Sequence, residues 1–123
     1  MDDEPSVRGL LHKFLETCGY HVTVASEGME AYELYKASLE SDRPVDAIIM
    51  DLLVNNGLGG LDSFRLIRKA NPEAVGIVSS AYSDDNTMAD YEKHGFSAVL
   101  AKPYQLLELK SILEKLCETE IQA

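Results

Sequence analysis

Apolar residues in this chain form short runs, separated by longer stretches in which they recur every three or four positions. The clearest short run covers residues 45–50, is apolar apart from Asp46, and ends abruptly at the carboxylate of Asp51. A short apolar run bounded by turn-forming residues is typical of a strand buried on both faces of a parallel sheet. We therefore expect residues 45–51 to form a buried strand with Asp51 at its carboxyl end.

The same reading gives the rest of the secondary structure. Further strands are predicted over residues 21–25, 74–80 and 97–101, the first because it alternates and contains β-branched residues. Helical spacing predicts helices over residues 5–18, 28–41, 61–70, 84 or 85 to 94, and 105–117. Residues 118–123 are expected to be a polar tail that frays.

Local signals set several of the expected helix ends. Pro5 is suited to a first helical turn, and Gly19 and Gly95 are suited to ending helices. Ser26 is a candidate N-cap, as is Asp84 or Asp85 for the later helix. Residues 52–60 contain three glycines and two asparagines, which predicts a loop able to adopt positive φ.

Strands and helices alternate, which predicts an α/β domain with a mostly parallel sheet and helices on both faces. One domain is expected over residues 1–123. One element is out of pattern, because no strand precedes the first helix. If that absence is real, a neighbouring chain, a rearranged sheet or altered packing is expected to compensate for two unpaired strand edges.

Composition narrows the class of protein. Apolar residues make up 46% of the chain, which excludes a disordered chain, and the net charge of −10 argues against direct nucleic-acid binding. No apolar run approaches the roughly 18 residues of a membrane span, and no signal peptide opens the chain. We expect a cytoplasmic protein in which Cys18 and Cys117 are reduced packing residues.

Polar side chains gather at the ends of three expected strands and before the first helix, where the end of a further strand would lie. They are Asp2 and Asp3 before the first helix, Asp51, Ser79 and Ser80, and Lys102. In a parallel sheet these ends share one edge, where ligands of open α/β sheets bind. Each residue alone has an ordinary reading, as a helix-dipole charge, a loop cap, a turn hydroxyl or a solvated lysine, so their joint placement carries the argument.

Carboxylates gathered at one edge repel each other unless a cation neutralises them, and Mg²⁺ is the expected cation. A carboxylate beside Mg²⁺ and a lysine can act as a nucleophile toward phosphorus and form an aspartyl phosphate. Lys102 and Mg²⁺ would then neutralise the transferring oxygens, to which Ser80 could donate a hydrogen bond.

Four short motifs resemble those of the response-regulator receiver domain of two-component signalling. They are Asp2-Asp3-Glu4-Pro5, Met50-Asp51-Leu52, Ser80-Ala81-Tyr82 and Lys102-Pro103-Tyr104. The resemblance covers nearly the whole chain. It implies a flavodoxin-like, three-layer α/β/α fold with strand order 2-1-3-4-5, whose central first strand is the element lacking here.

The resemblance also implies a function and its site residues. Asp51 would take a phosphoryl group from the phosphohistidine of a histidine kinase or phosphotransfer domain, assisted by Lys102 and Ser80. Asp2, Asp3, Asp51 and the backbone carbonyl of Leu53 would hold Mg²⁺, and the Lys102-Pro103 bond would be cis. Apart from its own phosphorylation and slow dephosphorylation, the domain would be a signalling switch, not an enzyme.

Departures from the family sharpen this picture. The Asn- and Gly-rich loop after Asp51 resembles that of receivers fused to sensory histidine kinases, which implies a hybrid-kinase receiver before a free-standing regulator. Val99 stands at the family's aromatic switch position, so the usual hydroxyl–aromatic relay is in doubt. Bulky Leu53 and Tyr82 are expected to slow the water that hydrolyses the phosphoryl group.

Two other readings remain open. A degenerate receiver would keep the fold but act only as a protein-interaction module, without binding Mg²⁺. A metal-dependent phosphatase with an aspartyl nucleophile would usually carry a second Asp two residues later, where this chain has Leu53. No DNA-binding pattern follows, so the output must pass to a fused kinase or a downstream partner, and the apolar stripe of the last helix is a plausible homodimer face.

Overall fold

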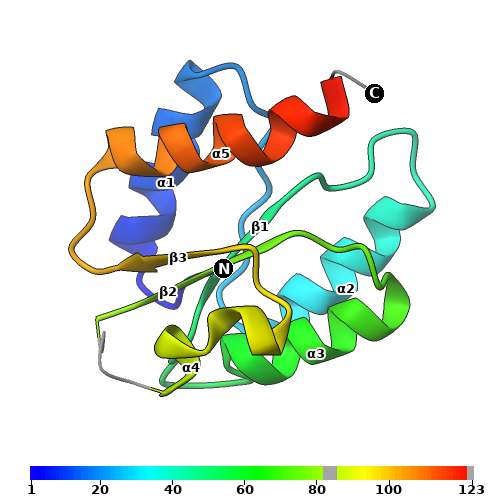
Figure 1. The fold of residues 1–123 in the computed structure, drawn as a ribbon, viewed down its shortest axis with the longest axis vertical. Helices are drawn as coiled ribbons and strands as arrows, with labels where there is room; N and C mark the ends of the chain where they lie inside the picture. The colour runs from blue at the N-terminus through cyan, green and yellow to red at the C-terminus, as the bar shows by residue number, and fades with distance from the viewer. Residues whose placement is uncertain (82–85, 122–123) are drawn as a thin grey trace.

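Three parallel strands form the sheet of this protein (Figure 1). The computed structural model describes residues 1–81 and 86–121, with side chains up to residue 116. The strands are β1 (Ile48–Asp51), β2 (Gly76–Ser80) and β3 (Ala98–Ala101), in the order β1-β2-β3. This arrangement matches the last three strands of the expected order 2-1-3-4-5, and the flavodoxin-like fold class is confirmed.

Helices cover both faces of the sheet. The four longest are α1 (Pro5–Thr17), α2 (Gly28–Leu39), α3 (Gly60–Ala70) and α5 (Leu106–Ile121). Figure 1 shows α1 and α5 on one side of the sheet and α2 and α3 on the other. The short helices α4 (Asn86–Ala89) and η1 (Tyr91–His94) lie between β2 and β3 in sequence.

Alternation along the strands divides the apolar core into two layers. Ile77 and Leu100 belong to the cluster that includes Leu15 of α1 and Leu109 of α5. Met50 and Val78 belong to the other cluster, with residues of α2 and α3 such as Tyr35 and Phe64. Successive strand residues point to opposite faces, so both faces need apolar side chains, and continuous apolar runs are the result.

Several predicted helix ends are confirmed and others are wrong. Gly19 and Gly95 follow their helices with φ of 97° and 89°. Ser26 does not cap α2, because the Glu27 carboxylate accepts from the N–H groups of Met29 and Glu30 instead. The last helix does not end at Cys117 but continues to Ile121, so the expected polar tail is partly helical.

Parts of three predictions lie outside the described residues. The helix expected to begin at Asp84 or Asp85 is seen only from Asn86 onward, as two short helical segments. Tyr82 also lies outside the described part, and so does the side chain of Cys117. Cys18 has a free thiol, as predicted.

The first two residues stand in for a strand between β1 and residues 20–25. The Met1 amino group donates to the Ile49 carbonyl at 2.6 Å, and the Asp51 N–H donates to the Met1 carbonyl at 3.0 Å. On the other side, the Asp2 N–H donates to the Ala25 carbonyl at 3.1 Å. Burial lowers the pKa of the Met1 amino group to about 6, against the opposing charges of Asp2 and Asp51.

Two predictions made for this region are wrong for one reason. Residues 21–25 are not a strand, and the start of β1 is only half-buried, at Ile48 and Ile49. A strand needs a hydrogen-bonded neighbour, and burial of both faces needs neighbours on both edges. Met1 and Asp2 supply that neighbour only at the carboxyl end of β1, where Met50 and Asp51 are buried.

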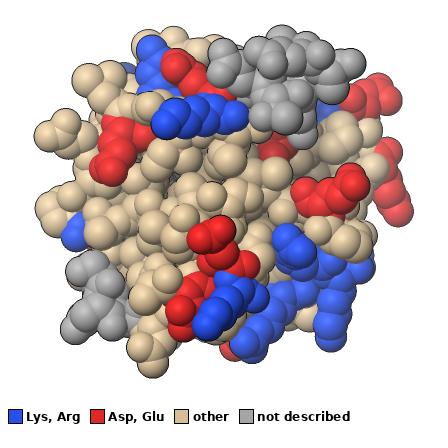
Figure 2. Space-filling model, in the orientation of Figure 1, with Lys and Arg blue, Asp and Glu red and all other residues tan. Residues whose placement is uncertain are grey.

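Charged groups are unevenly spread over the surface. On the face drawn in Figure 2, acidic groups occupy several separate regions, whereas basic groups gather mainly over α3, whose last turn contains Arg68 and Lys69. No helix in the described residues combines the length and apolar character needed to cross a membrane.

Candidate functional site

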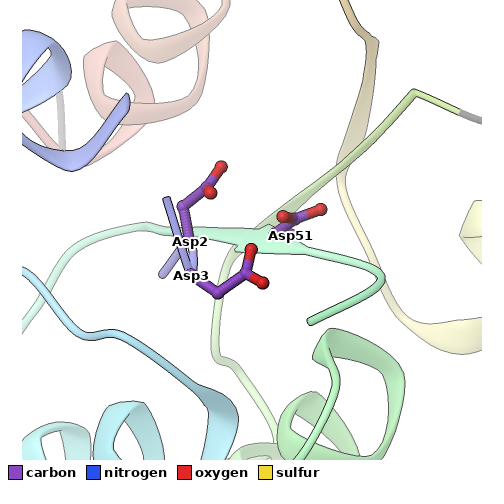
Figure 3. A group of neighbouring side chains, drawn as sticks. All are labelled: Asp2, Asp3 and Asp51. Carbon is purple, nitrogen blue, oxygen red and sulfur yellow. The ribbon is translucent and has the colours of Figure 1, made fainter. Parts of the chain in front are cut away.

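Three carboxylates meet at the carboxyl end of β1 (Figure 3). Asp2, Asp3 and Asp51 each place an oxygen within 4.8 Å of the others, although the third is far from the first two in sequence. Asp2 and Asp51 are only 5% and 6% exposed. The sequence prediction that these residues converge is confirmed for all three.

Backbone contacts fix Asp51 at the strand end. Asp51 pairs with Ser79 in the parallel register, and the following N–H, of Leu52, donates to the Ser79 carbonyl at 2.8 Å. Gly60 then begins α3 against this end, because a Cβ at Gly60 would lie 2.4 Å from the Asp51 carbonyl oxygen. A residue with a side chain at Gly60 would therefore displace the backbone that carries Asp51.

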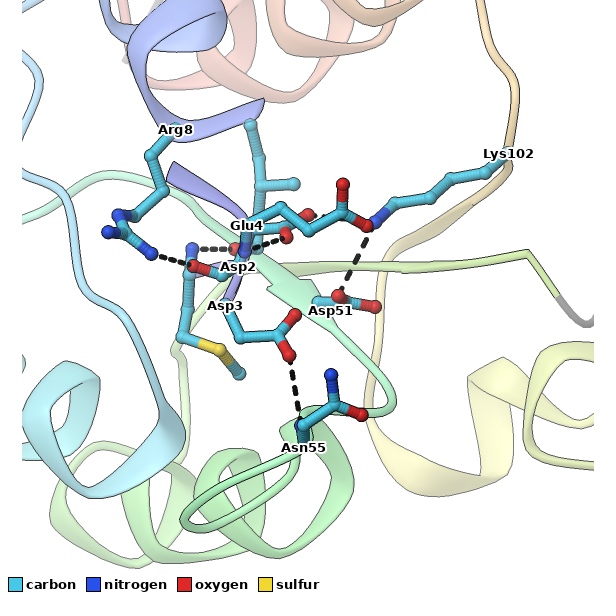
Figure 4. Close-up of polar contacts among 9 residues, drawn as sticks. Asp2, Asp3, Glu4, Arg8, Asp51, Asn55 and Lys102 are labelled. Carbon is cyan, nitrogen blue, oxygen red and sulfur yellow. Dashed lines mark hydrogen bonds and ion pairs between the residues drawn. The ribbon is translucent and has the colours of Figure 1, made fainter. Parts of the chain in front are cut away.

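Asp2 and Asp3 are held by hydrogen bonds from nearby residues and from the loop after Asp51 (Figure 4). The Glu4 N–H donates to Asp2 Oδ1 at 3.0 Å, and Arg8 donates to the Asp2 carbonyl at 2.8 Å. The Asn55 N–H donates to Asp3 Oδ2 at 2.9 Å. Asp3 thereby connects the start of the chain with the loop that follows Asp51.

Lys102 reaches the same pocket from the end of β3 (Figure 4). Its Nζ lies 2.8 Å from Asp2 Oδ2 and 3.3 Å from Asp51 Oδ2. The Lys102 N–H donates to the Ser80 carbonyl at 2.8 Å, which aligns the ends of β2 and β3. The Lys102–Pro103 bond is cis, as predicted.

The pocket contains more negative than positive charge. Burial raises the pKa of Asp51, and the nearby Asp2 carboxylate adds to this, while Lys102 and the Leu53 N–H oppose it. Burial would lower the pKa of Lys102, but its hydrogen bond to Asp2 and the charge of Asp51 outweigh burial, so that the pKa is raised. One ammonium thus faces two buried carboxylates and the half-buried Asp3.

The donor set fits a divalent cation that prefers oxygen. Three carboxylates from two segments converge, two of them are buried, and the single lysine leaves their charge incompletely neutralised. Mg²⁺ is commonly bound by a few carboxylates together with several waters. The charge and the oxygen donors therefore suit Mg²⁺ better than a soft transition metal.

The other two predicted site residues lie nearby. Ser80 ends β2 and is 1% exposed, next to the ends of β1 and β3. Leu53 has an exposed side chain, and its N–H donates to the Asp51 carboxylate. Metal binding by the Leu53 carbonyl and a catalytic role for Ser80 both stay predictions.

Sequence reasoning missed three residues that shape the pocket. Asn55 holds Asp3 through a backbone N–H, which no side-chain pattern reveals. Tyr104 is half-buried near Lys102, and partial desolvation raises the pKa of its phenol. Glu27 accepts from the Leu58 N–H at 3.1 Å as well as capping α2, so it ties that helix to the loop after Asp51.

Comparison with known proteins agrees with the fold and the pocket. Residues 1–114 match the family described as the response regulator receiver domain. The receiver domain of sensor histidine kinase PA1611 from Pseudomonas aeruginosa, solved with magnesium in its active-site cleft, is 25% identical with a TM-score of 0.80, over 94% of this chain and 92% of that one. TrrA from Thermotoga maritima, solved with Mg²⁺ and BeF, is 30% identical with a TM-score of 0.77, over 94% and 93%.

This chain belongs to the response-regulator receiver family of two-component signalling. The sensor kinase/phosphatase CqsS of Vibrio cholerae is 33% identical over 106 residues, which is 84% of this chain and 15% of CqsS. This chain spans 15–24% of the length of curated relatives such as CqsS and the NtrX-like regulators. Receiver domains are signalling domains that work with histidine kinases and phosphotransfer proteins.

Proposed function

We propose that this chain is a phosphoacceptor that takes a phosphoryl group onto Asp51 from the phosphohistidine of a histidine kinase or phosphotransfer domain. The observation that carries the proposal is the pocket itself. Carboxylates of Asp2 and Asp3 from the start of the chain, the carboxylate of Asp51 from the end of β1 and the ammonium of Lys102 from the end of β3 come to one place. Relatives with this fold were solved with magnesium, one of them together with BeF.

In the proposed reaction, an Asp51 carboxylate oxygen forms a bond to phosphorus while the phosphorus–nitrogen bond of the donor breaks. The bonding electron pair stays on the imidazole nitrogen, which is the leaving group. Bound Mg²⁺ would lower the charge on the phosphoryl oxygens, and Asp2, Asp3, Asp51 and the Leu53 carbonyl would hold it. Because Asp51 is partly desolvated, fewer water molecules must leave its carboxylate oxygen before that oxygen can attack phosphorus.

Lys102 has two roles in this proposal. Before transfer, its Nζ offsets the repulsion between Asp2 and Asp51. After transfer, the same ammonium pairs with a phosphoryl oxygen, and Ser80 donates a hydrogen bond to another. The change of partner at Lys102 would move the end of β3 and the start of α5, which is a route to a signal at the surface.

Acetyl phosphate tests the proposal without knowledge of the partner kinase. With Mg²⁺, we expect one phosphoryl group per chain, located at Asp51 by mass spectrometry after reductive trapping. Asp51→Asn should abolish labelling, and chelation of Mg²⁺ should reduce it at least tenfold. Asp46→Asn is the matched control, since Asp46 is exposed on the same segment and lies before the strand.

The competing function is that of an interaction module that keeps the fold without phosphorylation. It would be supported if Asp51 stayed unlabelled by acetyl phosphate and by several purified phosphohistidine donors, while the protein remained folded. A hybrid-kinase origin, a cytoplasmic location and a homodimer through α5 remain further proposals. The similarity to the receiver domain of a sensor histidine kinase favours the first of these.

A further inference from the structure

The loop after Asp51 contains an asparagine followed directly by a glycine, at Asn56 and Gly57. Both residues are exposed and lie outside any helix or strand. Among the described residues, neither the Asn56 side chain nor the Gly57 N–H has a hydrogen-bond partner. The side-chain amide of Asn56 and the next nitrogen along the chain are therefore both accessible and free to approach each other.

The loop cannot exchange Gly57 for a residue with a side chain. Gly57 has a φ of 107°, which residues with a Cβ rarely adopt. A Cβ at this position would also lie 2.7 Å from Glu27 Oε1, the atom that accepts from the N–H groups of Met29 and Leu58. The fold therefore requires glycine here, and the absence of a side chain leaves the Gly57 nitrogen unhindered.

We propose that Asn56 is a site of spontaneous deamidation, through attack of the Gly57 nitrogen on the Asn56 side chain. A bond forms between that nitrogen and Asn56 Cγ, the Cγ–Nδ2 bond breaks, and Nδ2 leaves as ammonia with the proton of the Gly57 N–H. Water then opens the resulting succinimide ring in one of two ways. Addition at Cγ breaks the new C–N bond and gives aspartate. Addition at the main-chain carbonyl carbon breaks the original peptide bond and gives isoaspartate, in which the chain continues through Cγ.

The isoaspartate product lengthens the loop between two fixed points. The Asn55 N–H donates to Asp3 Oδ2 at 2.9 Å (Figure 4), and the Leu58 N–H donates to Glu27 Oε1 at 3.1 Å. Only two residues lie between these donors, and isoaspartate adds one methylene group to the main chain there. The added length has to displace at least one of the two N–H groups from its carboxylate.

Both products also add a negative charge to a loop that already lies against two carboxylates. Asp3 and Glu27 accept from N–H groups on either side of position 56. Like charges repel, although the new carboxylate is exposed, so that solvent and salt screen it. The aspartate product should therefore loosen the loop slightly and the isoaspartate product more. Because Asp3 belongs to the acidic pocket, the change would reach the pocket as the protein ages.

Mass spectrometry of the purified chain over time tests the proposal. We expect Asn56 to lose its amide at least tenfold faster than Asn71, whose Nδ2 donates to the Tyr35 hydroxyl at 3.0 Å and whose next residue, Pro72, has no N–H. The folded chain should also react at no less than a tenth of the rate of a peptide with the sequence of residues 54–58. Enzymatic methylation of isoaspartate should locate that product at position 56. Asn56→Gln is the matched control and should stay unmodified, because its cyclisation would need a larger ring.

Hydrogen exchange separates the effect of length from that of charge. In the fraction that contains isoaspartate, the amides of Asn55 and Leu58 should exchange at least threefold faster than in the fresh protein. Asn56→Asp carries the charge without the added length, so the same amides should stay within twofold of the fresh protein.

Two results would overturn the proposed site: loss of the Asn56 amide no faster than that of Asn71, or a rate more than tenfold below that of the peptide. Unchanged exchange at Asn55 and Leu58 in the isoaspartate fraction would overturn the proposed effect on the loop. Neither Mg²⁺ nor a phosphoryl donor takes part, so the result is independent of phosphorylation at Asp51.

Discussion

β1 and β2 have similarly apolar sequences but different surroundings. All five residues of β2 are buried, and β2 pairs with β1 on one edge and β3 on the other. In β1, Met50 and Asp51 are buried but Ile48 and Ile49 are only half-buried. The two strands differ in their neighbours, because β1 has β2 along its length, whereas on its other edge the described part of the chain provides only Met1, at its carboxyl end.

The comparison shows that the sheet has a closed end and an open side. Contacts from Met1, Asp3 and Lys102 gather at the carboxyl ends of the strands, where the acidic pocket lies. Beside the first half of β1, a groove lined by residues 20–25 and 45–49 takes the place of a neighbour. Asp51, the residue proposed for phosphorylation, thus belongs to the part of the sheet that has neighbours on both sides.

The largest expected effect on the free energy of unfolding comes from truncating one isoleucine in each of the two strands. Ile77 is 0% exposed in β2, so Ile77→Ala should lower the free energy of unfolding by about 3–4 kcal/mol. Ile49 flanks the groove and is half-buried, so Ile49→Ala should cost only about 1–2 kcal/mol. Urea unfolding measures both, and equal losses would mean that the groove side of β1 is packed as tightly as β2.

A second pair of variants tests how tightly the pocket end is packed. Gly60→Ala should cost roughly 1–3 kcal/mol and reduce Mg²⁺-dependent labelling of Asp51, because its Cβ would lie 2.4 Å from the Asp51 carbonyl oxygen. Gly9→Ala is the control, since nothing lies within 4 Å of its Cβ in the middle of α1. It should stabilise the protein by roughly 0.5–1 kcal/mol. Thermal unfolding measures both variants, and a higher melting temperature for Gly60→Ala than for the wild type would contradict this account.

A third prediction concerns the charge stored in the pocket. Burial and Asp2 raise the pKa of Asp51, so its ionised form disfavours folding at neutral pH when no metal is present. Asp51→Asn should therefore raise metal-free stability by roughly 1 kcal/mol, as is common when a functional carboxylate is removed. Mg²⁺ should raise the melting temperature of the wild type more than that of Asp51→Asn, with Asp46→Asn behaving like the wild type.

Much of this architecture could be predicted because the strands that were found carry local signals. The apolar runs ending at Asp51, Ser80 and Lys102 identified three strand ends, and their shared edge identified the pocket. Residues 21–25 carried an equally good strand signal, but no local pattern shows whether a strand has a partner. The same limit applies to Ile48 and Ile49, whose burial depends on what lies beside them.

Contacts of the pocket that are made by backbone groups could not be predicted from the sequence either. The N–H of Asn55 holds Asp3, and any residue type would supply that donor. Glu27 was overlooked because Ser26 is the more usual capping residue. A glutamate can reach farther, and here its carboxylate also accepts from Leu58, which no short-range rule predicts.

The smallest expected effect tests whether Glu27 stiffens the closed end of the sheet. Hydrogen bonds from the backbone N–H groups of Met29, Leu58 and Glu30 lower the pKa of Glu27. A lowered pKa in the folded state stabilises the protein above the ordinary glutamate pKa, and this contribution is lost as the pH falls below about 4. Glu27→Ala should therefore melt at a slightly lower temperature than the wild type at neutral pH, and the difference should disappear in acid. Glu33→Ala, an exposed change on the same helix, should show no such convergence. If the deficit of Glu27→Ala were the same at both pH values, the carboxylate charge would have no part in holding the loop after Asp51.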